Sequence, residues 1–151
     1  MSTKFRAEFP LPDVDWEPTR PFWSGAARGE LVLPRCDACG RYIWYPDGAC
    51  HRCGADRHTW TPVSGRGRLF SWAVVRRAFI PQFAADVPYV TGLVTIDEDP
   101  AVRLATRVVD CDATALRIDM PVRASFRPLQ VAGVDRAIVA PFFTPVGPEK
   151  G

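Results

Sequence analysis

No stretch of the 151-residue sequence approaches the run of about 18 apolar residues that a membrane-spanning helix requires. The first residues also lack the apolar core of a secretory signal, so we expect a cytoplasmic protein without a membrane span. Histidine is scarce, with two residues in the chain, and no Ser-His-Asp arrangement can be traced. The sequence therefore predicts no catalytic centre of its own.

Net charge is low as well, at +2 for the whole chain. Its distribution is uneven, because eight arginines and three acids lie between residues 35 and 77. An anionic partner is one interpretation of this local excess. The other is that the arginines solvate a small metal-binding module, and composition does not decide between the two.

Four of the five cysteines form a C-x2-C-x10-C-x2-C array, consisting of Cys36, Cys39, Cys50 and Cys53. Two such pairs, each closing a tight turn, can bring four thiolates to one tetrahedral metal ion at about 2.3 Å. Gly40 and Gly54 directly follow the second cysteine of each pair, where the turn needs a residue that tolerates positive φ. The array predicts a zinc ribbon with one structural Zn²⁺.

Other interpretations of the array are two disulfides, a redox dithiol, or iron in place of zinc. Disulfides would need an oxidising compartment, which the missing secretory signal argues against. Zinc is preferred to iron because nothing else in the chain indicates electron transfer. Four bound thiolates leave no open position, so the site is expected to stabilise the fold. His51 and His58 are expected at the surface, and Cys111 as a small buried residue near a strand end.

The region before the array divides into two parts. Residues 1–18 carry three prolines and scattered acids, and are predicted to form an extended arm. A short helix is predicted over residues 19–29, with Thr19 as its cap and Gly29 at its end. This helix and the zinc ribbon are expected to form one region over residues 19–62.

After residue 62 the apolar stretches are short, rich in Val, Ile, Phe and Thr, and separated by turn residues. Strands are predicted over residues 69–77, 89–96, 102–109, 122–127 and 136–143. Five such strands can close a small barrel, which we place at residues 63–143, followed by a tail at 144–151.

Three connections have specific interpretations. Ser64-Gly65-Arg66-Gly67 is interpreted as a tight turn into the first strand, because no helix follows that would make it a phosphate cradle. The acids of Asp97-Glu98-Asp99 are expected at a solvated hairpin tip. The loop over residues 78–88 is long for a hairpin, and its exposed apolar residues make it a binding candidate.

The order of these parts is informative. It runs from Phe22-Trp23 and Arg35-Cys36-Asp37-Ala38-Cys39-Gly40, through Ser64-Gly65-Arg66-Gly67-Arg68-Leu69-Phe70-Ser71-Trp72 and Val87-Pro88-Tyr89-Val90, to Val109-Asp110-Cys111-Asp112 and Ile118-Asp119-Met120-Pro121-Val122. Over about residues 19–130, the chain resembles the family of small proteins that join a rubredoxin-like zinc ribbon to an OB-fold and accompany thiolase-type enzymes. Asp119 stands where that family commonly has glycine, and Asp tolerates a left-handed turn better than most residues.

The resemblance implies a mainly β fold: a short N-terminal helix, a rubredoxin-like zinc ribbon, then a five-stranded OB-fold barrel. It also implies a noncatalytic subunit that binds and scaffolds an enzyme of acyl-CoA or lipid metabolism in a hetero-oligomer. The implied partners are a thiolase-type enzyme, a thiolase-like aldolase of steroid side-chain degradation, or an acyl-CoA hydratase. Family members in some cases help to bind the CoA moiety. The identity of the partner, the acyl chain and the stoichiometry stay open.

Eight further residues are candidates for contact with acyl-CoA or the partner, namely Phe22, Trp23, Trp44, Tyr45, Arg76, Arg77, Phe79 and Phe83. The two arginines could meet CoA phosphates, and the aromatic residues of the long loop and the ribbon could pack on the cofactor. The helix aromatics and the loop are expected to anchor a partner protein. Internal packing remains an alternative for the aromatic residues of the helix and of the ribbon.

The alternative function is that of a single-stranded nucleic-acid-binding OB-fold protein, with Arg66, Arg68, Phe70, Trp72 and Arg76 as its surface. A strand-binding groove usually gives a basic domain, and the net charge here is +2. We therefore do not expect nucleic acid as the partner. An independent enzyme such as a thioesterase would lack a general base.

Overall fold

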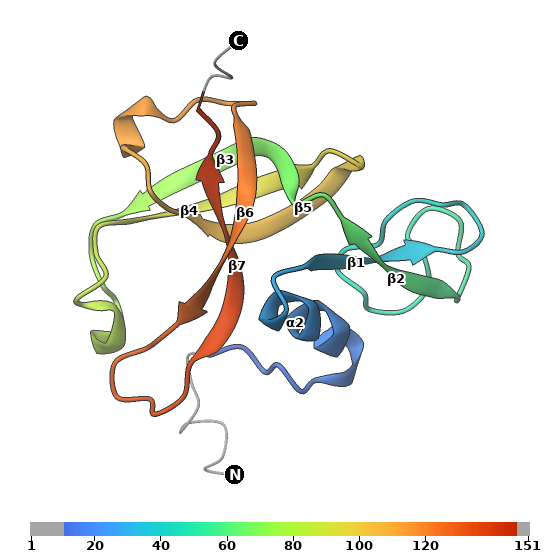
Figure 1. The fold of residues 1–151 in the computed structure, drawn as a ribbon, viewed down its shortest axis with the longest axis horizontal. Helices are drawn as coiled ribbons and strands as arrows, with labels where there is room; N and C mark the ends of the chain where they lie inside the picture. The colour runs from blue at the N-terminus through green and yellow to red at the C-terminus, as the bar shows by residue number, and fades with distance from the viewer. Residues whose placement is uncertain (1–10, 148–151) are drawn as a thin grey trace.

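The computed structural model describes residues 11–147, and residues 1–10 and 148–151 lie outside the described part. Its strands form two sheets, a two-stranded ribbon and a closed five-stranded barrel. The short helix α2 lies between them, in contact with a strand of each (Figure 1). The predicted fold class, mainly β with one N-terminal helix, a ribbon and a five-stranded barrel, is confirmed.

The N-terminal helix is shorter than the predicted span. A 3-10 turn, η1, covers Glu17–Thr19, and α2 follows directly over Arg20–Ala27. Thr19 is buried and its side chain makes no capping hydrogen bond, so the expected cap is wrong. Gly29 lies two residues beyond the helix at φ 77°, as its role in the helix end requires. Between residues 11 and 147, no helix has the length and apolar character to cross a bilayer.

The segment before α2 is folded where the structure describes it. Residues 1–10 of the predicted arm lie outside the described residues. Near its other end, Trp16 stacks on Tyr45 with ring centroids 5.9 Å apart, and the 3-10 turn replaces an extended chain. The last part of the arm therefore packs against the ribbon. In the sequence, Trp16 stands alone among scattered prolines and acids, so this contact could not be predicted.

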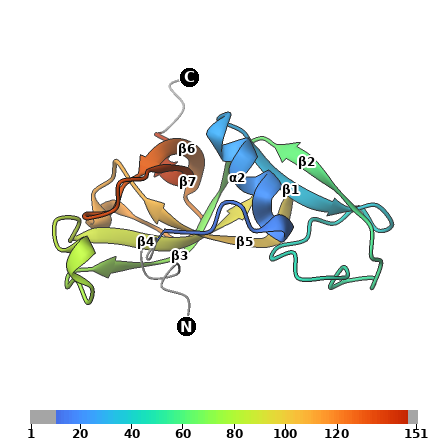
Figure 2. The same cartoon turned by 90° about the horizontal axis from the view of Figure 1, so that it is seen from below.

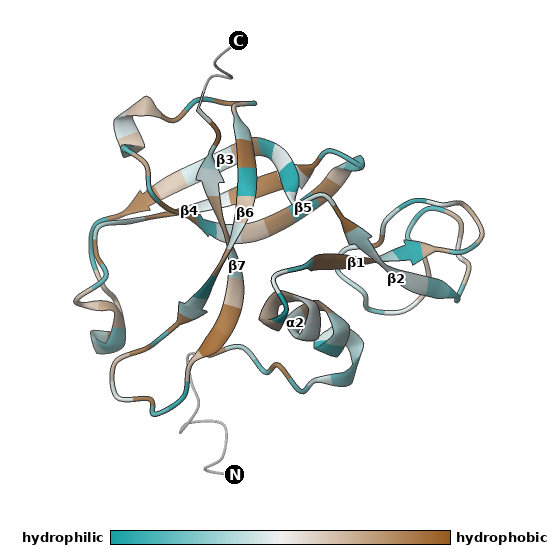
Figure 3. Cartoon of the chain, viewed as in Figure 1, coloured by the Kyte–Doolittle hydropathy of each residue, from teal (hydrophilic) through white to brown (hydrophobic). Residues whose placement is uncertain are grey.

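The ribbon consists of β1 (Leu31–Cys36) and β2 (His58–Val63), paired antiparallel with Leu31 opposite Val63 and Cys36 opposite His58. Every residue of β1 except Arg35 is buried, and Figure 3 shows it as one of the most apolar strands. The first part of β1 is buried because Leu31 and Leu33 pack in the barrel core. Its last residue, Cys36, is buried in the cysteine cluster and is a metal-ligand candidate.

The barrel contains β3 (Arg66–Val75), β4 (Tyr89–Ile96), β5 (Asp99–Val108), β6 (Pro121–Leu129) and β7 (Ile138–Pro145). The strands are ordered β3-β4-β5-β7-β6 and the sheet closes through β3 and β6. All neighbours are antiparallel except β5 and β7, which are parallel and share the single pair Val108 and Phe143. Short 3-10 turns, η2 (Pro81–Phe83) and η3 (Ala113–Ala115), lie in two of the loops.

The strand ends differ by a few residues from the predicted ones. β3 ends at Val75, so Arg76 and Arg77 lie in the following loop and not on the strand. β7 continues to Pro145, two residues into the predicted tail, of which residues 148–151 lie outside the described part. Apolar residues mark where each strand lies, but they do not mark where its last ladder hydrogen bond falls.

Two predicted turns have the expected geometry. Gly65 has φ 78°, which confirms a tight turn into β3. Gly67 faces the next strand so closely that a Cβ at this position would lie 1.8 Å from the carbonyl oxygen of Thr95. Asp119 adopts φ 64°, so aspartate does occupy the left-handed position.

One hydrophobic core joins the barrel to the ribbon and the helix. Leu69, Val94 and Phe143 form its centre and are completely buried. Leu33 of β1 and Phe22 of α2 belong to the same cluster. The view in Figure 2 shows α2 lying against β1 on one side and the β6–β7 pair on the other. The ribbon strand is therefore fixed to the barrel by side chains, although the two sheets share no ladder hydrogen bonds.

Candidate metal centre and aromatic groove

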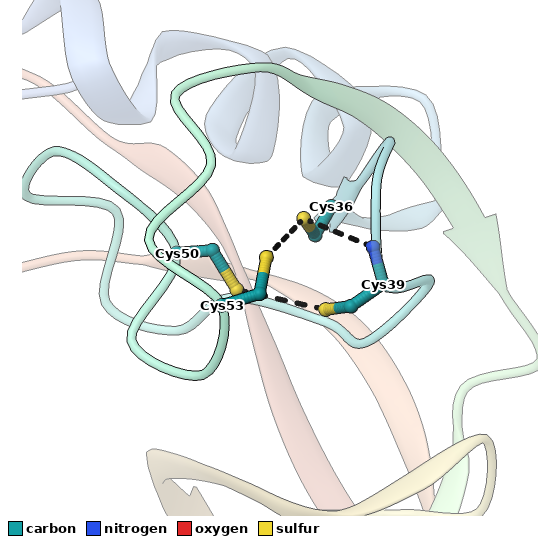
Figure 4. Close-up of side chains that lie close together, drawn as sticks. All are labelled: Cys36, Cys39, Cys50 and Cys53. Carbon is teal, nitrogen blue, oxygen red and sulfur yellow. Dashed lines mark hydrogen bonds between the residues drawn. The ribbon is translucent and has the colours of Figure 1, made fainter.

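The four cysteines of the array meet at the free end of the ribbon (Figure 4). Their sulfur atoms all lie within 4.8 Å of one another, with Cys36 Sγ 3.5 Å from Cys53 Sγ and Cys39 Sγ 3.7 Å from Cys50 Sγ. Four thiolates around a tetrahedral ion at about 2.3 Å have sulfur atoms about 3.8 Å apart. No disulfide links the cysteines. The site fits one metal ion closed off by four thiolates.

The two cysteine pairs form matching turns. Gly40 N donates to the Cys36 carbonyl at 3.0 Å, and Gly54 N donates to the Cys50 carbonyl at 2.9 Å. Both glycines are left-handed, at φ 73° and 77°. Each turn thus needs glycine after its second cysteine, as the spacing predicted.

Backbone amides aim at the sulfurs of the first cysteine in each pair. The N–H groups of Cys53 and Arg52 hold the pKa of Cys50 at about 6, and the N–H of Cys39 lowers the pKa of Cys36. The amide of Ala55 favours the Cys53 thiolate, but burial and the hydrogen bonds to the other three cysteines together raise its pKa to about 11. The amides therefore favour the thiolate form of Cys36 and Cys50, and a cation bound among the four sulfurs would offset the repulsion between further thiolates.

The other cysteine and the histidines lie outside this cluster. His51 and His58 are exposed, as predicted, and His51 Nε2 lies 2.8 Å from the Asp47 carboxylate. Cys111 is half-buried, and burial raises its thiol pKa, so it stays protonated. Within residues 11–147, the four cysteines make the one group of three or more metal-ligand side chains whose ligand atoms converge.

A groove of about 480 Å³ lies along the seam where β5 meets β7. Its walls come from six places in the sequence: α2, the ribbon segment after Cys39, the loop before β4, the start of β4, the β5–β7 seam, and the end of β6 with the residues just after it. The walls are mainly apolar and carry eight aromatic rings, and Phe22 packs on Trp44 with centroids 4.8 Å apart. Such a concave, apolar surface has the character of a ligand or anchor site.

Arg107 is the charged residue of the groove wall. Its guanidinium lies over Tyr89 at 4.2 Å and near Phe83 at 5.5 Å, and Asp86 holds it by an ion pair of 3.6 Å. The two ring contacts and the ion pair hold the guanidinium at the groove wall, where it can meet an anionic group. Sequence reasoning did not single out Tyr89 or Arg107; alternation along β4 and β5 places both on the outer face of the barrel.

The structure brings five of the eight candidate binding residues together. Phe22, Trp23, Trp44, Tyr45 and Phe83 all line the groove. Phe22 is buried in the protein's own core and supports the groove from beneath, where we had expected it to present a free face. The remaining three candidates, Arg76, Arg77 and Phe79, are exposed on the loop outside the groove, and Phe79 is 89% exposed.

The acidic turn between β4 and β5 corrects another expectation. Asp97 and Glu98 are exposed as expected, but the Asp99 side chain is 3% exposed. Its carboxylate accepts hydrogen bonds from the backbone N–H of Tyr42 and from that of Ala101, both at 3.2 Å. A carboxylate this deeply buried needs such partners. No local signal distinguishes Asp99 from its two neighbours, because Tyr42 and Arg41, which cover it from the ribbon side, are more than 50 residues away in the sequence.

The surface proposed for nucleic acid is also only partly present. Arg66, Arg68, Phe70 and Arg76 are exposed, and the Arg103 guanidinium covers the Phe70 ring at 4.1 Å. Trp72 is partly buried against the barrel core, so it offers a strand-binding face less of its ring than an exposed residue would.

A closed four-cysteine ribbon packed on a closed five-stranded barrel places the protein in the class of zinc-ribbon OB-fold proteins. The rubredoxin-like zinc ribbon domain of ChsH2 matches residues 23–59, and the C-terminal OB-fold domain of ChsH2 matches residues 60–127. The two domain models together cover residues 23–127, more than half of the chain, so the chain belongs to the family that joins a ChsH2-type zinc ribbon to a ChsH2-type OB-fold domain.

Two proteins described as DUF35 domain-containing scaffold proteins are similar to this chain. The protein of Methanocaldococcus jannaschii is 28% identical over 109 residues, which cover 72% of this chain and 75% of that protein. The protein of Methanothermobacter thermautotrophicus is 29% identical over 115 residues, covering 74% and 82% respectively.

Two solved structures share the fold. A chain described as "Ltp2-ChsH2(DUF35) aldolase" matches with a TM-score of 0.73 and 27% identity, over 89% of this chain and 98% of that chain. A DUF35 protein of unknown function from Sulfolobus solfataricus matches with a TM-score of 0.56 and 12% identity, over 82% and 87%. The second likeness concerns the fold alone.

Proposed function

We propose that this chain is a noncatalytic accessory subunit that binds and scaffolds an enzyme of acyl-CoA metabolism, with an aldolase as the first expected partner. The observation that carries the proposal is the match over nearly the whole length of a chain from an Ltp2-ChsH2 aldolase. The similarity to two scaffold proteins supports the same role. Thiolase-type enzymes and acyl-CoA hydratases are the other partners that the family resemblance implies.

The chemistry of the two candidate sites supports a binding role. Four thiolates complete a tetrahedral coordination, so a bound metal has no open position for water or substrate. In the groove, Arg107 is held by Asp86 and two aromatic rings, and a guanidinium does not act as an acid or base near neutral pH. The residues of these two sites are therefore suited to binding a metal ion, a ligand or a partner, and not to proton transfer.

The groove and the loop over residues 78–88 form the expected contact surface. Trp23, Trp44 and Tyr45 offer flat apolar faces, and Phe79 offers a fully projecting side chain. Large aromatic anchors of this kind concentrate the energy of an interface. For an acyl-CoA contact, the groove would take an apolar or flat part of the ligand, with Arg107 and the exposed Arg76 and Arg77 near its phosphates.

We further propose that the metal is one structural zinc ion per chain, held by Cys36, Cys39, Cys50 and Cys53. Zn²⁺ suits four tetrahedral thiolates and brings no redox chemistry. The cysteines are unpaired, which suits the reducing environment of the cytoplasm. Elemental analysis of the purified protein distinguishes zinc from iron.

Copurification with an aldolase, thiolase or hydratase subunit encoded beside this chain tests the proposal. Trp23→Ala and Phe79→Ala should each weaken complex formation by about 1–4 kcal/mol, because each removes an aromatic anchor. Phe79 projects from the surface, so its replacement leaves the fold intact. The dissociation constants of wild-type and variant chains provide the measurement.

Ile118→Ala is the matched control, since Ile118 is a large apolar residue that is 69% exposed but lies outside the groove. It should bind like wild type. Equal affinity of all three variants would place the interface elsewhere on the surface. Failure of the wild-type chain to bind any such subunit would reject the scaffold function itself.

A further inference from the structure

One short stretch of chain, residues 40–45, leads from the metal site to the groove. Gly40 follows the metal-ligand candidate Cys39, and Trp44 and Tyr45 line the groove. Between these ends the stretch lies beside β1: Cys36 N donates to the Arg41 carbonyl at 2.8 Å, and Ile43 N donates to the Pro34 carbonyl at 2.7 Å. The position of the groove wall therefore depends on how this stretch is held.

The middle of the stretch is tied to the barrel by Asp99. One oxygen of its buried carboxylate accepts the backbone N–H of Tyr42, and the other lies 3.5 Å from the Arg41 guanidinium. Ala101 N donates to the latter oxygen, which orients the carboxylate from the barrel side. Asp99 is the one buried acid among the described residues. Its burial costs free energy unless these partners are present.

Besides Asp99, the stretch is held by its backbone hydrogen bonds to β1 and by Arg35 Nε, which donates to the Gly40 carbonyl at 2.8 Å, and the side chains of Tyr42 and Trp44 pack against the main core. Its one ladder contact is an isolated bridge between Arg35 and Tyr42, and no strand or helix includes residues 40–45. Ile43 packs in a cluster of its own with Cys36 and Cys50, so even this apolar contact depends on the cysteine site. The Trp44 wall then rests on Phe22, which is fixed in the main core.

We propose that the metal-loaded cysteine site and Asp99 together hold the Trp44–Tyr45 wall, so that metal occupancy sets the shape of the groove and Asp99 is the positioning residue that couples them. Loss of the metal frees one end of the stretch, and loss of the Asp99 carboxylate frees its middle. Either change lets the wall move while the barrel keeps its core. The biological consequence rests on the proposed function, because it assumes that the groove is a binding surface; the coupling itself does not.

Amide hydrogen exchange and fluorine NMR of the metal-loaded full-length protein test the coupling. In Asp99→Ala, the amides of Tyr42 and Ile43 should exchange about tenfold faster, because one loses its acceptor and the other its support. The fluorotryptophan resonance of Trp44, assigned with Trp44→Phe, should shift or broaden. The amide of Leu69, which donates to the Met120 carbonyl at 3.0 Å, should exchange at the wild-type rate.

Removal of the metal from the wild-type chain with a chelator should produce the same changes at Tyr42, Ile43 and Trp44. Asp97→Asn is the matched control, because Asp97 lies in the same turn but is exposed, and all signals should stay as in wild type. Asp99→Ala should keep its full metal content. Wild-type exchange and an unmoved Trp44 resonance, either in Asp99→Ala or after metal removal, would overturn the coupling.

Asp99→Asn decides the matter if Asp99→Ala does not fold. Its amide keeps an acceptor for Tyr42 N but loses the charge beside Arg41, so a smaller increase in exchange supports the coupling, and wild-type behaviour overturns it. Affinity for the partner subunit is measured separately. If the expected spectral changes occur but the wild-type chain binds no such subunit, the coupling stands and the proposed function is rejected. If the spectra do not change but the subunit binds, the coupling is rejected and the proposed function stands.

Discussion

The ribbon tip and the barrel keep their shapes by different means. Residues 37–57 contain no strand or helix, and the apolar cluster there consists of Cys36, Ile43 and Cys50 with Ala55 packed beside them. The barrel instead closes a sheet around completely buried side chains such as Leu69 and Phe143. The tip has little apolar surface to bury, so we expect an ion bound to its four cysteines to hold it, whereas the barrel is held by packing.

Cys39→Ser is expected to have the largest effect, and it tests whether the ribbon tip depends on the metal while the barrel does not. We expect the loss of metal binding and of ordered structure over residues 37–57, while the barrel stays folded, because structural zinc contributes about 10–16 kcal/mol in small zinc modules. Elemental analysis gives the metal content, and an amide NMR spectrum reports both regions.

Cys111→Ser provides the control, since Cys111 lies outside the cluster and its replacement should leave the metal content unchanged. Loss of the barrel resonances in Cys39→Ser would mean that the tip and the barrel fold as one cooperative unit. Retention of the metal by that variant would contradict the four-thiolate site.

The converse change is Phe143→Ala in the barrel. Phe143 is completely buried and pairs with Val108 where β5 meets β7, so its truncation should lower the free energy of unfolding by about 3–5 kcal/mol. Urea unfolding followed by circular dichroism measures the change. The cysteine site of the folded variant should still bind one metal ion.

Phe79→Ala is the same substitution at an exposed position, and it should not change the urea midpoint. A Phe143→Ala protein as stable as wild type would indicate that the barrel core is loosely packed. A folded variant without metal would show that the tip takes its shape from the barrel.

The smallest expected effect is a pH dependence at the edge of the barrel. Arg127 Nη1 donates to Asp110 Oδ1 at 3.1 Å and Nη2 donates to Oδ2, and this pairing lowers the pKa of Asp110 below its ordinary value. Because the folded-state pKa is depressed, the stabilisation is fully present above the unfolded value of about 4 and is lost as pH falls through the folded pKa.

Asp110→Asn removes the charge and tolerates the left-handed φ of 55° at this position. Urea unfolding of both proteins should give a small difference in stability at pH 7 that disappears in acid below the folded pKa of Asp110. A difference that persists unchanged in acid would assign the effect to packing and not to the ion pair.

Much of the fold could be predicted because it is encoded by short-range patterns. The cysteine spacing predicted the metal site, and short Val- and Phe-rich stretches predicted all five barrel strands. Gly65 and Asp119 marked turns at which a left-handed residue is needed, and both positions have positive φ. Each of these features depends on residues close together in the sequence, the cysteine array being the longest with 17 positions from Cys36 to Cys53, so the sequence displays it directly.

The groove and the buried Asp99 were decided by tertiary structure. Trp44 meets Phe22 only because β1 and α2 pack on the barrel, and Phe83 meets Arg107 only because the loop before β4 folds over β5. Asp99 and Tyr42 are 57 residues apart, so no local pattern could separate this acid from its solvated neighbours. By itself, the sequence identified the four candidate metal ligands and the strands of the barrel, since periodicity and spacing are local. Which aromatic rings share a wall, and which carboxylate is buried, follows from packing between distant segments.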